Sequence, residues 1–220
     1  MLGLFDSGSG GLNTVRYIKR YAPKTDLVYL IDRARAPYGI KTENELAEIA
    51  CENIERLSDM GASRVLIACC TASTVHHLLP RRVADASIPI ISEIAKRADK
   101  ATRSGRIGVI ATNRTVDTHA FQKELDGYEV YEKALPELVT AIDGGLTDLS
   151  ANECDCEKIK KMLEPVLTKR IDTLILGCTH FPALVKTITA IAKPYGVRAV
   201  IDSARVGADL LKAETKISMR

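Results

Sequence analysis

The stretch RVLIACCTAS at residues 64–73 has a counterpart in DTLILGCTHF at residues 172–181. Each begins with a short run of leucine and β-branched residues, which is typical of a buried strand. Each run then reaches a cysteine, Cys69 in the first copy and Cys178 in the second, with a threonine within two residues. Because a hydroxyl can cap a helix, the pattern predicts a thiol between a strand and a helix, at the edge where open α/β sheets bind ligands.

Outside these two stretches, apolar runs of strand length alternate with segments of helical spacing. We expect strands at 2–6, 26–32, 64–69, 88–92, 106–112, 128–134, 173–178 and 197–202. We expect helices at 12–21, 42–60, 71–79, 115–125, 138–142, 155–170, 183–193 and near 206–211. This alternation is typical of parallel sheets.

Short residue patterns predict where some of the helices begin and end. Thr42 and Glu45 have the spacing of a capping box, and Gly61 is expected to end the helix that they start. Thr71 or Ser73 is expected to cap the helix after Cys69.

The order of elements repeats, which suggests a duplication. Each half reads β-α-β-α-β-α-β, and the offset from Gly3 to Gly108 nearly equals that from Cys69 to Cys178. We therefore predict an α/β fold with two pseudo-symmetric lobes, whose mostly parallel sheets face a central cleft. The first lobe is expected at residues 1–95, joined by a C-terminal helix at 205–220, and the second at 96–204.

Composition narrows the class of protein. The chain has 220 residues, 46% of them hydrophobic, with 31 basic and 28 acidic side chains and a net charge of +3. This balance argues against nucleic acid or an anionic membrane surface as partner, and no apolar run reaches the roughly 18 residues of a membrane span. The start, MLGLFDSG, is expected to be a strand and loop rather than a signal peptide. Six cysteines without such a signal favour the cytoplasm and free thiols.

One thiol in each lobe suits a reaction in which one thiol removes a proton from one face of a carbon and the other thiol adds a proton to the opposite face. The reference pKa of a thiol, about 8.5, is close enough to neutral for acid and base work. Both cysteines precede an expected helix start, which is expected to lower the thiol pKa. Asp6 and His180 could tune or relay protons to the nearer thiol. The alternatives are that the cysteines are core residues and that Asp6 and His180 cap helices or fill the core.

Two other kinds of site match the sequence less well. Three thiols and one imidazole, from Cys69, Cys70, Cys178 and His180, fit tetrahedral zinc, but no C-x₂-C spacing is present, so we predict no metal. The glycines of SGSGG at 7–11 lack the third glycine of a dinucleotide fingerprint. Their N–H groups could still hold a carboxylate at a helix N-terminus.

Five segments together resemble the cofactor-independent glutamate racemases: FDSGSGGL at 5–12, PYGIK at 37–41, ACCTAS at 68–73, GCTHFP at 177–182 and IDSA at 201–204. The resemblance covers nearly the whole chain in order. It implies the aspartate/glutamate racemase fold, a frequent homodimer, no cofactor, and interconversion of L- and D-glutamate for bacterial peptidoglycan. The expected roles are therefore cell wall biogenesis and cell shape.

The resemblance also implies roles for single residues. Cys69 and Cys178 match the two catalytic bases, and Asp6 and His180 match the supporting acid–base groups. The positions expected to contact substrate are Asp6, Ser7, Tyr38, Gly39, Cys70, Thr71, Thr179 and His180.

Two positions depart from the family pattern. Cys70 stands where the family has an asparagine, so an amide is replaced by a weak thiol donor. Asp143 stands where the family usually has a catalytic glutamate. A racemase for aspartate or another small acid, and a weakly active or inactive homologue with a binding role, therefore stay open as alternatives.

Overall fold

The computed structural model describes residues 1–218, and their side chains through residue 214. The last two residues of the expected C-terminal helix, 219–220, lie outside the described residues. The chain forms two compact units. The first unit contains Met1–Ile90 and the chain from Ala204 onward, and the second contains Ile91–Ser203.

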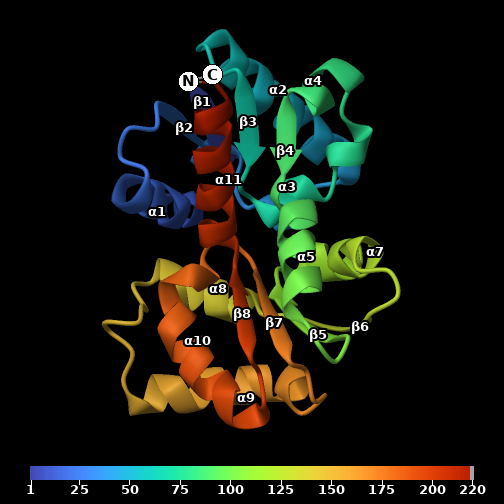
Figure 1. The fold of residues 1–220 in the computed structure, drawn as a ribbon, viewed down its shortest axis with the longest axis vertical. Coiled ribbons are helices and arrows are strands. Elements are labelled where there is room, and N and C mark those ends of the chain that lie inside the picture. Colours follow the sequence, from blue (N-terminus) through green and yellow to red (C-terminus); the bar gives the residue numbers. More distant parts are fainter. Residues whose placement is uncertain (219–220) are drawn as a thin grey trace. The chain divides into compact units, whose positions relative to one another are not determined.

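The first unit is built on a four-stranded parallel sheet with the order β2-β1-β3-β4 (Figure 1). Its strands are β1 (Leu2–Asp6), β2 (Leu27–Ile31), β3 (Arg64–Ile67) and β4 (Ser87–Pro89). Its helices are α1 (Leu12–Tyr21), α2 (Glu43–Asp59), α3 (Cys70–Ser73), α4 (Arg81–Asp85) and, from Ala204 onward, α11 (Ser203–Ser218). The side chains of α2 and of β1 and β3 form one buried cluster, which includes Phe5, Leu46, Ile54, Leu57 and Ile67.

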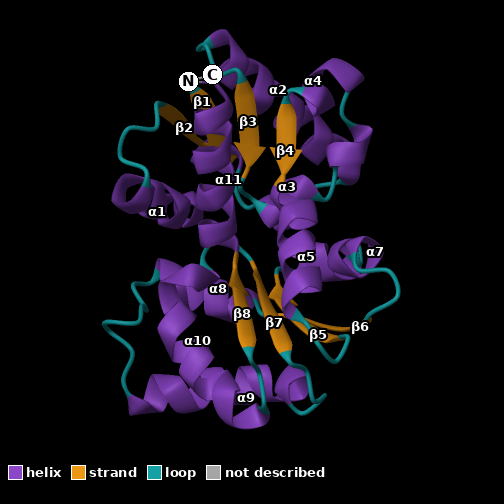
Figure 2. Ribbon diagram, viewed as in Figure 1, coloured by secondary structure: helices purple, strands orange, loops and turns teal. Residues whose placement is uncertain are grey.

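The second unit repeats this arrangement with the order β6-β5-β7-β8, again all parallel (Figure 2). Its strands are β5 (Arg106–Ala111), β6 (Glu129–Ala134), β7 (Thr173–Gly177) and β8 (Ala199–Asp202). Its helices are α5 (Ile90–Ala101), α6 (Asn113–Asp117), α7 (Ala120–Glu124), α8 (Pro136–Asp143), α9 (Glu153–Leu167) and α10 (Val185–Ala192). The predicted α/β fold with two parallel sheets is confirmed.

Each sheet has a switch point between its first and third strands. The chain leaves β1 for β2 on one side and returns to β3 on the other, and β5, β6 and β7 repeat this path. The connections therefore diverge at the carboxyl ends of β1 and β3, which opens a crevice where α/β sheets bind ligands. Phe5 is in register with Ile67, and Ala111 with Gly177. Cys69 and Cys178 therefore both leave the sheet at a switch point.

Several local predictions hold. Thr42 and Glu45 form the predicted capping box, in which the Thr42 side chain accepts from the Glu45 N–H and the Glu45 carboxylate accepts from the Thr42 N–H. Gly61 follows the helix with a φ of 94°, a conformation that glycine adopts at little cost.

Other local predictions are wrong. The expected strand at 88–92 ends at Pro89, because the Ile90 N–H donates to the Ser73 hydroxyl instead of to a neighbouring strand. Neither Thr71 nor Ser73 caps α3: Cys69 occupies the N-cap position, and no side chain makes a cap hydrogen bond there. The expected helix at 115–125 is broken into α6 and α7, since His119 between them has a left-handed backbone with a φ of 50°.

None of the helices described within residues 1–218 is long and apolar enough to cross a membrane.

Candidate active site

Cys69 lies two residues beyond β3, at the N-cap position of α3. Its side chain is buried, and its Sγ lies 3.4 Å from the Oγ of Ser7, which follows the end of β1. The parallel register of β1 and β3 brings these two residues together although they are far apart in sequence. The thiol therefore sits beside a hydroxyl at the switch point of the first unit.

The surroundings of Cys69 raise its pKa to about 11. Burial is the largest cause, and the negative charge of Asp6 adds to it. Hydrogen bonds from the Ser7 hydroxyl and from the N–H groups of Ala72 and Ser7 act the other way, but they do not outweigh burial. The start of α3 does lower this pKa through the Ala72 N–H, as predicted, but burial outweighs that effect, so the thiol keeps its proton at neutral pH.

Asp6 is fully buried and holds the glycine-rich loop that follows it. Its Oδ2 accepts hydrogen bonds from the N–H groups of Gly8, at 3.3 Å, and Gly11, at 3.0 Å. These two N–H groups therefore hold a carboxylate, as the sequence suggested, and that carboxylate belongs to Asp6 of the chain itself. A Cβ on Gly11 would lie 2.5 Å from the Tyr29 hydroxyl and 2.8 Å from the Asp6 Cβ, so a larger residue does not fit.

Tyr29 is a neighbour of this site that sequence reasoning missed. Its hydroxyl donates to the Gly8 carbonyl at 3.1 Å. Burial first, and then the negative charges of Asp6 and Cys69, raise the Tyr29 pKa, so the phenol stays protonated. No motif marks Tyr29, because its role depends on the pairing of β2 with β1.

The Tyr38–Ile40 turn brings a second tyrosine to the thiol. Tyr38 is 2% exposed and belongs to the same buried cluster as Cys69. Its hydroxyl donates to Asp32 Oδ2 at 2.6 Å, so the phenol proton is already in use. Gly39 is exposed, with no atom within 4 Å of the position of a Cβ. Cys70 and Thr71 are buried in the first turn of α3.

In the second unit, Cys178 comes directly after β7 and is buried. Its Sγ lies 3.6 Å from Nδ1 of His180, and Nε2 of His180 lies 3.1 Å from Oδ1 of Asp143 at the end of α8. A neutral imidazole has one donor and one acceptor nitrogen. With Nε2–H donated to Asp143, Nδ1 is free to accept the Cys178 proton, so the three side chains form a thiol–imidazole–carboxylate chain.

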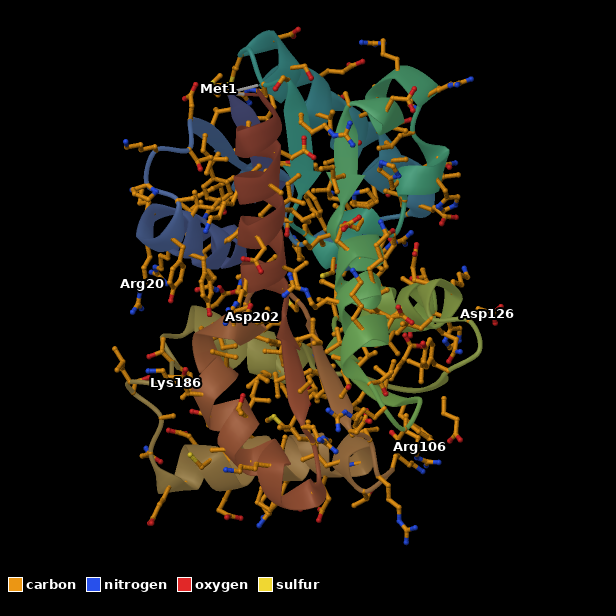
Figure 3. The ribbon with its side chains drawn as sticks, viewed as in Figure 1. Met1, Arg20, Arg106, Asp126, Lys186 and Asp202 are labelled. Carbon is orange, nitrogen blue, oxygen red and sulfur yellow. The ribbon has the colours of Figure 1, made fainter. Side chains whose placement is uncertain are left out.

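The backbone around Cys178 is held by a hydrogen bond and by close packing. The Ser203 hydroxyl donates to the Cys178 carbonyl at 3.4 Å, and Ser203 follows Asp202, which ends β8 and is labelled in Figure 3. A Cβ on Gly177 would lie 2.8 Å from the Phe121 ring and 3.0 Å from the Ile110 carbonyl oxygen. Thr179 is buried next to the cysteine.

The expected site residues thus fall into two groups, one in each unit. Those around Cys69 are Asp6, Ser7, Tyr38, Gly39, Cys70 and Thr71, and those around Cys178 are Thr179, His180 and Asp143. All six cysteines lie in the described part of the chain, and none of them forms a disulfide. Among the side chains that the structure describes, no group of three or more His, Cys, Asp or Glu residues is arranged to hold a metal ion.

Comparison with known proteins gives a consistent result. Residues 12–211 match the family model described as Asp/Glu/Hydantoin racemase. The chain is 37% identical to a glutamate racemase of Persephonella marina over 96% of this chain and 81% of that one. It is similar to the crystal structure of the glutamate racemase isoform RacE1 of Bacillus anthracis, with a TM-score of 0.85, 31% identity, and coverage of 99% and 82% of the two chains. A glutamate racemase of Francisella tularensis, solved in complex with D-glutamate, matches with a TM-score of 0.83, 28% identity and 99% and 81% coverage.

Proposed function

Because the chain belongs to the Asp/Glu/hydantoin racemase family, we propose that it interconverts L- and D-glutamate, with one cysteine of each unit as an acid–base group. Two buried thiols at equivalent strand ends carry the proposal, since each has a polar neighbour suited to proton transfer. Glutamate as substrate is supported by relatives named glutamate racemase that align with nearly the whole chain.

In the proposed L-to-D direction, Cys178 is the base. His180 takes the thiol proton at Nδ1 and Asp143 stabilises the resulting imidazolium, so a thiolate forms that removes the α-proton of the substrate. Cys69 starts with its proton in place, as its raised pKa favours, and delivers that proton to the opposite face of the α-carbon. This turnover leaves Cys178 as a thiol, His180 as an imidazolium and Cys69 as a thiolate, and transfer of the His180 proton to Cys69 through solvent restores the starting state.

In the reverse direction, Cys69 is the base. The Ser7 hydroxyl and the N–H groups of Ser7 and Ala72 stabilise its thiolate, and Asp6 serves as the nearby carboxylate that supports proton exchange. Ser7, Tyr38, Gly39, Cys70, Thr71 and Thr179 are the proposed substrate contacts, together with Asp6 and His180.

A related acid such as aspartate is the second candidate substrate. Cys70 favours it, because a buried thiol replaces the amide that the family pattern places beside the substrate. The proposed chemistry at the α-carbon would be the same, and only the hold on the substrate would differ.

We further propose that the protein works in the cytoplasm as a homodimer, without a cofactor, and that its D-glutamate supplies peptidoglycan synthesis. Six cysteines that form no disulfide support the reducing compartment. The two compact units are the proposed N-terminal and second lobes of the enzyme.

The test follows the circular dichroism of L-glutamate, and then of L-aspartate, with purified protein and no added cofactor. The signal of the true substrate should decay to zero, since the two enantiomers are equal in free energy. Cys69→Ser and Cys178→Ser should each abolish the decay, while Cys154→Ser, at an exposed cysteine of α9, should leave it unchanged. Retained activity in either of the first two variants, or inertness of the wild type toward both acids, would refute the proposal.

A further inference from the structure

A buried carboxylate holds the loop between β2 and α2. Asp32, directly after β2, is 7% exposed. Its Oδ2 accepts hydrogen bonds from the Tyr38 hydroxyl at 2.6 Å, from Arg35 Nε at 2.7 Å and from Asn53 Nδ2 at 3.1 Å. One oxygen therefore ties together the loop, its turn and helix α2.

The residues that bind Asp32 also form hydrogen bonds with one another. Asn53 Nδ2 also lies within hydrogen-bond distance of the Tyr38 oxygen, at 3.1 Å, and Arg35 Nη2 donates to Asn53 Oδ1 at 2.8 Å. Arg35 also pairs with Glu52 on α2. Burial alone would raise the pKa of Asp32, but the hydrogen bonds from Tyr38 and Asn53 and the Arg35 charge outweigh it and hold that pKa below its usual range. Asp32 is therefore an anion at neutral pH.

The network leads to Cys69 through Tyr38. The Tyr38–Ile40 turn packs against α3, and Tyr38 shares a buried cluster with Cys69. Burial, then the hydrogen bond and charge of Asp32, and then the charge of Cys69 raise the pKa of the Tyr38 phenol. The phenol donates its one proton to Asp32. The hydrogen-bond donors that this turn can offer a ligand are therefore its backbone N–H groups.

We propose that Asp32 is a positioning residue for the reaction proposed above. Through Tyr38 it fixes the direction of the Tyr38 and Gly39 N–H groups and keeps the tyrosine ring in the buried cluster that it shares with Cys69. The inference rests on the proposed function, and it adds a residue that none of the motifs contains. Without the Asp32 charge, Tyr38 loses the charge-assisted hydrogen bond that orients it, and the turn is free to shift.

The first measurement compares KM and kcat for wild type, Asp32→Asn, Tyr38→Phe and the double variant. Misplacement by about 1 Å can lower the rate of an enzyme about 100-fold. Because the turn is proposed to bind the substrate, we expect most of the loss in binding: KM should rise about tenfold or more in Asp32→Asn, with a smaller effect on kcat. Because Asp32 acts through Tyr38, the double variant should be little worse than the poorer single variant. Glu55→Gln, a carboxylate of α2 outside the network, is the matched control and should keep the wild-type KM.

The second measurement needs no turnover. Alkylation of Cys69 by iodoacetamide at pH 9, followed by peptide mass spectrometry, should become several-fold faster in Asp32→Asn as Tyr38 loosens. The exposed Cys154 in the same molecules should react at an unchanged rate. If the wild type fails to racemise glutamate but Cys69 alkylation responds as expected, the proposed function fails and the positioning network stands.

A purely structural role gives a different pattern. Asp32→Asn would then lower the melting temperature, while the KM of the folded protein and the Cys69 alkylation rate stay at the wild-type values. That result overturns the proposal. If Asp32→Asn does not fold, the Tyr38→Phe variant provides the test. An unchanged KM together with unchanged alkylation of Cys69 in Tyr38→Phe would then refute the positioning role of Asp32.

Discussion

At the residue scale, Cys70 is the most informative position. It is buried in the first turn of α3, beside Cys69, where the family pattern has asparagine. We predict that Cys70→Asn lowers the KM for glutamate about threefold to tenfold, because one net hydrogen bond contributes about 0.5–1.5 kcal/mol. Cys70→Ala removes the thiol without adding an amide and should show no such gain. If Cys70→Asn binds glutamate no better than wild type, position 70 is adapted to another acid or does not touch the substrate.

Ser7 gives a prediction about pH. Its hydroxyl stabilises the Cys69 thiolate and so lowers the pKa of that thiol, which burial and Asp6 nevertheless raise to about 11. Ser7→Ala should therefore raise that pKa further and slow the alkylation of Cys69 at pH 9, where only a small fraction is thiolate. The rate at exposed Cys154 serves as the internal reference. Faster alkylation of Cys69 in Ser7→Ala would contradict this account.

At the element scale, the close approach of β7 to its neighbours depends on Gly177. A Cβ there would lie 2.8 Å from the Phe121 ring and 3.0 Å from the Ile110 carbonyl oxygen of β5. We predict that Gly177→Ala lowers the free energy of unfolding by about 1–3 kcal/mol, as overpacking does, and displaces Cys178. Urea denaturation measures this. Gly39→Ala, where a Cβ meets no atom within 4 Å, should leave the stability nearly unchanged.

Asp172 ties the end of α5 to the start of β7. Its carboxylate accepts from the Thr102 hydroxyl and from the N–H groups of Arg103 and Ser104, each at 2.7 Å. Burial opposes ionisation, but these hydrogen bonds outweigh it and lower the Asp172 pKa to about 2.

Since the folded pKa of Asp172 lies below the unfolded value of about 3.9, its contribution is fully present above about pH 4 and is lost as the pH falls through about 2. The size is about 2 kcal/mol. We predict that Asp172→Asn destabilises the protein at pH 7 and flattens the fall in stability between pH 4 and pH 2, as measured by urea titrations. An equally steep fall in the variant would show that other carboxylates carry the acid sensitivity.

At the scale of the whole molecule, the two-thiol mechanism predicts where deuterium appears. Starting from L-glutamate in deuterated water, Cys178 takes the α-proton and Cys69, already exchanged to S–D, delivers deuterium. The D product should carry deuterium from the first turnover, while the early L pool stays largely protiated. Nuclear magnetic resonance of the α-position measures both. A single base serving both faces would instead return substrate hydrogen to the product, and substantial undeuterated product in the initial phase would exclude the two-thiol mechanism.

Strand and helix positions were largely predictable because they depend on local patterns. Apolar runs of strand length mark β1 and β7, and the Thr42 capping box marks the start of α2. The failures occur where a distant contact overrides the local pattern. Ser73 captures the Ile90 N–H and ends β4 early, and the expected helix at 115–125 breaks at His119, whose imidazole bonds to Glu132 of β6.

The sequence by itself determined the alternation of strands and helices, the two parallel sheets and a cysteine after the third strand of each, because spacing and residue type encode these features locally. Only the tertiary structure decided the partners of the polar side chains. Asp32 with Asn53, Ser7 with Cys69 and His180 with Asp143 are far apart in sequence. Strand register and loop path bring them together, and neither follows from periodicity. Burial, which likewise depends on long-range packing, raises the Cys69 pKa where the sequence predicted a lowered one.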